Sequence, residues 1–375
     1  MATLTNISII ARKSVRYLIY GIILLIVGRI FLNAGIKVYK KVFPAATPAP
    51  TIKYGKLSNI PFPENSAIAK LTYTLETAEG GLPTNIGTQA RVYFMPKAGA
   101  NLLSLDVAKG KATALGFSQN VQQVSDTIYK FKNPDYPTAL QINIISGAFS
   151  ISYDLVSDKT PINFKPPVSE VAAAAFKSFL SEGGMLPEDL TGTVTHDFLK
   201  ISNGDLVSAI SLSEANFVKV NLFRKNYNDL PSMTGNPNQA NVWAIMGGAN
   251  SQAQKYIASE FHYHPVDETQ FSTYPIKTPE VAFSELQNGQ AYIANLGLNK
   301  DDDVLKIRRV YLAYFDPDIV TEYYQPIYVF EGDNGFIAYL PAVTPDYYQA
   351  ATTPVPTAGA IPSPTATSSA TPIAN

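Results

Sequence analysis

Two hydrophobic periods alternate along the chain. Runs such as QARVYFM at 89–95 and ALQINII at 139–145 alternate apolar and polar positions, which predicts half-buried strands because neighbouring side chains of a strand point to opposite faces. The run SEVAAAAFKSFLS at 169–181 instead keeps apolar positions four residues apart, which predicts a helix with one buried face. The pattern therefore predicts an α+β fold in which each helix is followed by several strands.

Turn signals divide this pattern into three similar modules. Asn203-Gly204 and Asn334-Gly335 each lie between apolar runs and predict tight hairpins, since this dipeptide suits the left-handed backbone of such turns. Thr278 can cap a helix whose first residue is Pro279. We predict a first α+β module at 65–160, a second at 161–276 and a third at 277–348.

The N-terminal part contains a candidate transmembrane helix, which we expect to span 17–39 after a cytoplasmic N-terminus at 1–16. Residues 17–36 read YLIYGIILLIVGRIFLNAGI, and a helix of this length reaches ~30 Å, the thickness of a hydrocarbon core. Arg29 interrupts the segment, and its side chain either snorkels to the interface or contacts an acidic group of a membrane partner. A cleaved signal peptide with an apolar region at 18–28 is the rival interpretation.

Basic residues flank both ends of the candidate helix, so the positive-inside rule does not fix its orientation. Three precede the apolar run 17–36 and three follow it: Arg12, Lys13, Arg16, Lys37, Lys40 and Lys41. The body of the chain has no cysteine and ends in a Thr/Pro/Ser/Ala-rich segment at 349–375, which we expect to be disordered. We therefore expect a single-pass membrane protein with its N-terminus inside and most of the chain outside the cytoplasm. A Pro-rich stalk at 40–64 would join the two parts.

Charge excludes one class of partner. Nine of the 29 basic residues precede Glu64 and no acidic residue does, so the rest of the chain carries 20 basic against 30 acidic residues. A body this acidic repels the phosphate backbone, so we expect no nucleic-acid partner. The lack of cysteine also excludes disulfides, thiol catalysis and Cys-ligated metal centres.

Candidate catalytic chemistry is sparse. His262 and His264 lie two residues apart in a predicted strand and, with Glu260, offer a weak candidate site for zinc. Polar side chains on a solvent-facing surface are the alternative interpretation. The sequence contains no G-x-S-x-G, H-E-x-x-H, Walker or Rossmann pattern. We expect neither a catalytic site nor a cofactor.

The segment 310–330, VYLAYFDPDIVTEYYQPIYVF, contains seven Tyr or Phe residues. Its first part is apolar on both faces, which indicates a strand that is covered on both sides. The rings after the Asp-Pro-Asp turn are the candidates for an exposed binding surface: Tyr323, Tyr324 and Tyr328. Exposed tyrosines could stack on a sugar or pack against a partner protein.

The order of elements in the last third of the chain resembles a known group of proteins. The helix TPEVAFSELQNG, the long strand ending in RVYLAYFDP, and then QPIYVFEG and FIAYLPAV are similar to the C-terminal part of PepSY-like and YycH/YycI-type proteins. The resemblance is greatest over 278–343. It implies an extracytoplasmic, membrane-anchored protein that modulates a membrane sensor kinase or a peptidase by binding and is not an enzyme.

Three functions follow as hypotheses. The first is a non-enzymatic envelope regulator or scaffold that contacts another membrane or envelope protein. The second is a module that binds cell-wall glycan or peptide through its tyrosine-rich surface. The third is an envelope hydrolase assisted by a metal at His262 and His264.

Overall fold

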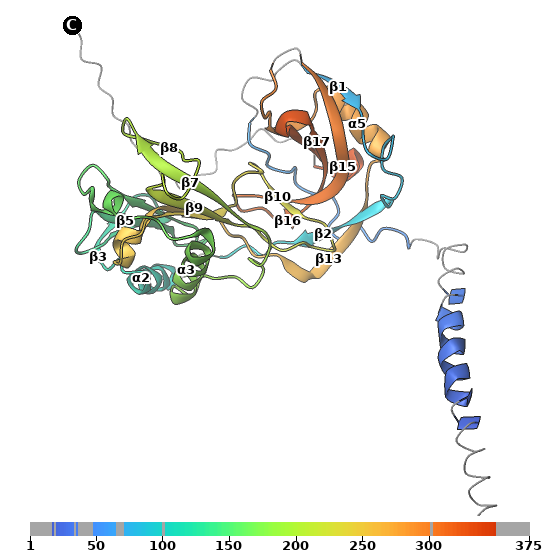
Figure 1. The fold of residues 1–375 in the computed structure, drawn as a ribbon, viewed down its shortest axis with the longest axis horizontal. Helices are drawn as coiled ribbons and strands as arrows, with labels where there is room; N and C mark the ends of the chain where they lie inside the picture. Colours follow the sequence, from blue (N-terminus) through green and yellow to red (C-terminus); the bar gives the residue numbers. More distant parts are fainter. Residues whose placement is uncertain are drawn as a thin grey trace, which may run out of the picture. The chain divides into compact units, whose positions relative to one another are not determined.

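The computed structural model describes residues 17–18, 20–33, 35–36, 48–64, 71–99, 102–300 and 303–349. The chain divides into two units, Met1–Ala49 and Pro50–Asn375. In the first unit, residues 17–18, 20–33 and 35–36 are helical (Figure 1). Arg29 lies among them with an exposed side chain. Over the residues that the structure describes, no helix combines the length and apolar character needed to cross a membrane. The predicted cytoplasmic segment 1–16 and the tail from residue 350 onward lie outside the described residues.

A nine-stranded antiparallel sheet is the larger element of the second unit (Figure 1). Its strands lie in the order β3 (Gln119–Gln123), β4 (Ile128–Lys132), β5 (Thr138–Asn143), β6 (Phe149–Tyr153), β12 (Tyr256–Phe261), β11 (Val242–Met246), β9 (Phe217–Leu222), β7 (Val194–Ser202) and β8 (Asp205–Ser208). The predicted turn between β7 and β8 is confirmed, with φ of 54° at Asn203 and 91° at Gly204.

Two helices cover one face of this sheet, α2 (Ser104–Ala114) and α3 (Ser169–Glu182) (Figure 1). The predicted buried face of α3 is confirmed at Ala172, Phe176 and Phe179, which lie in the core between helix and sheet, whereas Val171, which shares the four-residue spacing, is 56% exposed. Alternate residues of the strands, such as Leu140 and Ala244, fill the same core. A second apolar cluster lies on the opposite face of the sheet. Among the described residues, no α-helix contributes a side chain to it.

The remaining strands form two smaller sheets. The six-stranded sheet has the order β1 (Thr72–Leu75), β15 (Val304–Asp316), β17 (Pro326–Gly332), β18 (Ile337–Pro341) and β14 (Tyr292–Asn295), and β10 (Ser232–Thr234) also pairs with β15. The three-stranded sheet has the order β13 (Asp267–Pro275), β2 (Gln89–Phe94) and β16 (Tyr323–Tyr324). The predicted hairpin between β17 and β18 is confirmed by φ of 58° at Asn334 and 83° at Gly335.

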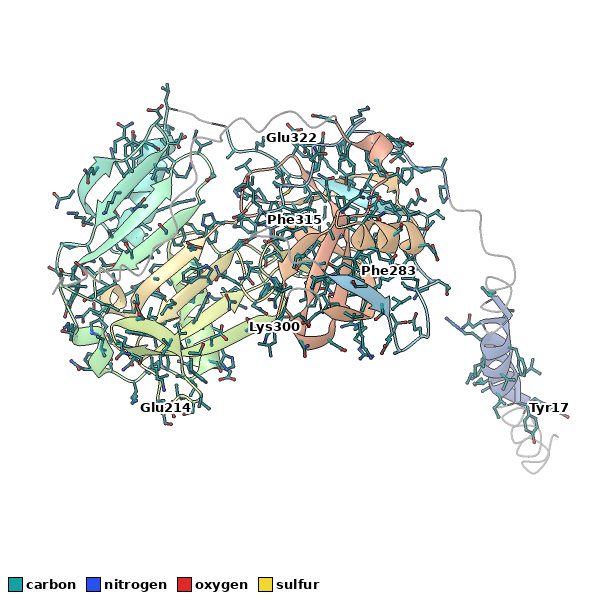
Figure 2. The ribbon with its side chains drawn as sticks, turned by 90° about the horizontal axis from the view of Figure 1, so that it is seen from above. Tyr17, Glu214, Phe283, Lys300, Phe315 and Glu322 are labelled. Carbon is teal, nitrogen blue, oxygen red and sulfur yellow. The ribbon has the colours of Figure 1, made fainter. Side chains whose placement is uncertain are left out.

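Helix α5 (Pro279–Gln287) packs on the six-stranded sheet. The Thr278 hydroxyl oxygen accepts the backbone N–H of Val281, so the predicted cap is confirmed. Ala282 and Leu286 are fully buried, and Phe283, labelled in Figure 2, lies with its ring 6.4 Å from that of Phe330. The short helical turns are α4 (Gln252–Lys255), η1 (Thr160–Asn163), η2 (Asp333–Gly335) and η3 (Pro345–Tyr347).

The fold is α+β as predicted, but the sheets cross the predicted module boundaries. Strands β1 and β2, expected in the first module, pair with β15 and β13 near the other end of the chain. Strands β3 to β6 of the first module and β7 to β12 of the second share the nine-stranded sheet, except for β10. The reason is that the hydrophobic period specifies a strand, whereas its partner depends on contacts distant in sequence.

The predicted stalk is wrong over the described residues 50–62, which pack against the body. Leu57 is fully buried and its backbone N–H donates to the Tyr347 carbonyl at 2.7 Å. Phe62 stacks on Tyr292 with ring centroids 5.2 Å apart. Burial of the apolar side chains between the prolines contributes more free energy than an extended stalk would retain as conformational entropy.

Candidate functional site

A groove of about 910 Å³ lies on the face of the nine-stranded sheet that α2 and α3 leave open. We call it the sheet groove. Its floor comes from β5, β6, β12 and β11, one wall from the β7–β8 hairpin, and the other from the 154–162 segment that follows β6. A volume of this size falls in the range of ligand sites in proteins.

Strand alternation explains why the floor is apolar. In β11, Val242, Ala244 and Met246 point into the helix-covered core, so Trp243 and Ile245 point to the other face. Tyr153 and Ile257 join them in a second apolar cluster under the groove. The run VWAIM is apolar at every position, which indicates that both faces of this strand contact apolar material.

The aromatic rings of the floor are held by polar partners. The Trp243 Nε1–H donates to Glu260 Oε2 at 3.0 Å, and Lys219 Nζ lies 4.6 Å from the centre of the Trp243 ring. Burial lowers the pKa of Lys219. The Tyr153 hydroxyl donates to Asp158, and burial together with this carboxylate raises the pKa of Tyr153. The floor is therefore fixed before any ligand binds.

The rim of the groove is basic. Lys130 and Lys132 project from β4 on the groove side, because the intervening Phe131 belongs to the helix-covered core. Lys159 lies on the wall formed by the 154–162 segment. Over the residues that the structure describes, none of these three lysines forms an ion pair. Val156, 80% exposed, adds apolar surface beside Lys159.

The residues predicted as a weak metal site are engaged in separate contacts. Strand β12 ends at Phe261, so His262 and His264 lie beyond it and do not share the face of one strand. His264 is buried with its ring Nε2 3.2 Å from the Asp318 carbonyl, and burial lowers its pKa to about 4. His262 Nε2 lies 3.9 Å from Glu260, whose carboxylate accepts the Trp243 N–H. In the described part of the chain, no three His, Asp or Glu side chains form a group that could hold a metal ion.

The predicted tyrosine surface is wrong for two of its three residues. Tyr324 and Tyr328 are fully buried, and the Tyr328 hydroxyl donates to the Lys277 carbonyl at 2.6 Å. Tyr323 is partly exposed and stacks on Tyr54 with ring centroids 5.0 Å apart. Pairing of β16 with β2 places alternate rings of Tyr323-Tyr324 on opposite faces, so only one of them can face solvent.

A buried ion cluster around Arg224 escaped the sequence analysis. The Arg224 side chain is 2% exposed, with Nε 3.1 Å from Asp316 Oδ1 and Nη1 3.4 Å from Asp189 Oδ2. Arg224 also donates to the His264 carbonyl, and its guanidinium lies 4.3 Å from the Tyr263 ring centre. Desolvation outweighs the attraction of Arg224 and raises the pKa of Asp316 to about 6. The contacts join the end of β9 to the end of β15, so the cluster has a structural role.

Comparison with known proteins gives no family assignment. No family model and no curated protein matches the chain. The solved structure of an uncharacterized protein from Eubacterium rectale is 13% identical, with a TM-score of 0.38 over 76% of this chain and 92% of its own. The C-terminal domain of YpeB from Bacillus megaterium is 13% identical, with a TM-score of 0.30 over 68% of this chain and 96% of its own. At such TM-scores neither likeness carries an argument about function.

Proposed function

We propose that this chain is a membrane-anchored, extracytoplasmic binding protein that acts without catalysis, as a PepSY-like envelope regulator or scaffold that contacts another protein. The observation that carries the proposal is the sheet groove. It combines an apolar, pre-arranged floor with a charged rim, which is the anatomy of a protein-recognition surface. This surface replaces the predicted one at Tyr324 and Tyr328.

The anchor and the orientation belong to the same proposal. The described helical residues between 17 and 36 are mostly apolar, with Arg29 and Asn33 as the strongly polar exceptions, and an inserted helix would hold the body at a membrane surface. Arg29 would then contact an acidic group of the partner within the membrane. A partner would thus be recognised twice, once by the helix and once by the groove.

Site-specific photo-cross-linking in intact cells tests the proposal. A photoreactive residue at Val156 lies on the groove, whereas one at Ile210, which is 92% exposed and does not line the groove, is the control. We expect a discrete cross-linked protein from Val156 and none from Ile210. Loss of that product on Arg29→Leu would support the intramembrane contact. The proposal fails if Val156 captures no protein above the Ile210 background.

A glycan-binding role has one specific observation in its favour, the partly exposed ring of Tyr323 stacked on Tyr54. Sugar rings stack on tyrosine faces in this way. Retention of the full-length protein on purified cell-wall material, lost in Tyr323→Ala and kept in Lys159→Glu, would favour this second function over groove-mediated protein binding.

A further inference from the structure

We infer that the sheet groove binds an acidic, apolar peptide segment of a partner protein. The inference rests on the proposed function and specifies its ligand. It depends on the charge of the groove compared with the charge of the body, on the chemistry of the floor, and on the shape of the two walls.

The charge of the groove is opposite to that of the body. From residue 64 onward the chain carries 20 basic and 30 acidic residues. The groove nevertheless has Lys130, Lys132 and Lys159 on its rim and one acidic side chain, Asp154, among the residues that line it. Two further carboxylates nearby, Asp158 and Glu260, accept hydrogen bonds from the floor residues Tyr153 and Trp243. The Asp154 carboxylate accepts the backbone N–H groups of Val156 and Ser157, both at about 3 Å, so it is engaged locally. The lysines therefore remain available to an anionic ligand.

Because the floor and walls of the groove are apolar, a ligand that fits it carries apolar groups between its charged groups. Trp243, Ile245 and Tyr153 form the floor, while Leu206 of the hairpin and Val156 of the opposite wall contribute apolar sides. The lysines come from β4 and from the 154–162 segment, and both line the groove together with this apolar floor. A peptide with acidic side chains flanking apolar or aromatic ones satisfies both features, whereas a compact inorganic anion would leave the floor unfilled.

The chain's own tail fits this site poorly. Residues 350–375 contain no acidic side chain, so none of their side chains offers an anionic group to the three lysines. Charge complementarity therefore favours a separate partner.

Selection from a random dodecapeptide library against the immobilised full-length protein in detergent tests the inference. We expect the selected peptides to be enriched in Asp and Glu together with apolar residues. Their affinity should fall about tenfold or more in the triple variant Lys130→Glu, Lys132→Glu, Lys159→Glu, because the rim then repels them. The matched control is Lys53→Glu, Lys56→Glu, Lys300→Glu, which makes the same charge change at exposed positions outside the groove and should bind as the parent does.

Each other result has a defined meaning. Selected peptides without acidic enrichment, or with equal affinity for the two triple variants, overturn the inference. Binding that appears only after residues 350–375 are removed overturns it in favour of the tail. An anionic oligosaccharide that competes where acidic peptides do not overturns the peptide assignment. If any of these occurs while Val156 still captures a protein in cells, the proposed function stands and only the ligand class is wrong.

Discussion

At the residue scale, Arg224 shows how a buried charge can hold a fold together without forming a functional site. We predict that Arg224→Met lowers the free energy of unfolding by about 3–5 kcal/mol, because Asp189 and Asp316 would lose their shared cation inside the protein. Arg308 is the matched control, since it also bridges two acidic residues, Glu76 and Asp333, but on the surface. Arg308→Met should cost about 1 kcal/mol or less by urea denaturation. Equal losses in the two variants would contradict a structural role for the buried cluster.

Two titrating residues of the Arg224 cluster give opposite pH dependences. The pKa of Asp316 rises from its ordinary 3.8 to about 6 on folding, so the folded state binds more protons in this window and Asp316 makes stability fall as pH rises. The pKa of His264 falls from 6.5 to about 4, so the unfolded state binds more protons and His264 makes stability increase as pH rises. The two contributions oppose each other between pH 4 and 6.

Single variants should reveal these opposite slopes. We predict that Asp316→Asn becomes more stable relative to the parent as pH increases from 4 to 6, since the variant lacks the fall in stability that Asp316 causes in the parent. His264→Gln should become less stable relative to the parent over the same range. Urea denaturation at intervals of half a pH unit measures both differences, and the shared titration of surface carboxylates cancels in each. Slopes of the same sign in the two variants would show that the assigned pKa shifts are wrong.

At the element scale, the sequence predicted what local chemistry determines. The cap at Thr278, the Asn-Gly turns and the buried face of α3 are all as predicted, because each depends on residues within a few positions of one another. The strand at 267–275 was not predicted, since DETQFSTYP has few apolar residues and its pairing with β2 involves residues about 180 positions away. Local propensity carries no information about such a partner.

Alanine substitutions at two glycines separate the effect of helix propensity from the effect of close packing. Gly110 lies inside helix α2, and a methyl group added there meets no atom within 4 Å. We predict that Gly110→Ala raises the free energy of unfolding by roughly 0.5–1 kcal/mol, because alanine loses less backbone entropy in a helix. A methyl group on Gly248 would instead lie 1.8 Å from the Lys165 carbonyl oxygen, so Gly248→Ala should destabilise the protein. Thermal unfolding measures both, and a destabilising Gly110→Ala would contradict the placement of that helix.

At the scale of the whole molecule, the path of the chain explains why the sequence alone predicted neither the correct module boundaries nor the sheet groove. After β9 the chain leaves the nine-stranded sheet, adds β10 to the six-stranded sheet beside β15, and returns as β11. The sheet groove is assembled from strands between β4 and β12, so no single motif encodes it. The sequence offered one signal, the doubly apolar run VWAIM, and the lysines of the rim are dispersed over 30 residues of sequence.

The segment before the first strand provides a final test of this architecture. Leu57 is fully buried among Val92, Tyr274 and Val343, and its backbone bonds to the segment at Tyr347–Gln349. The start and end of the described body therefore stabilise each other. We predict that Leu57→Ala lowers the free energy of unfolding by about 2–5 kcal/mol, as expected for a buried leucine. The neighbouring Lys56 is exposed, so Lys56→Ala should change it by no more than about 0.5 kcal/mol. If Leu57→Ala were as neutral as Lys56→Ala in urea denaturation, residues 50–62 would be a free stalk in solution.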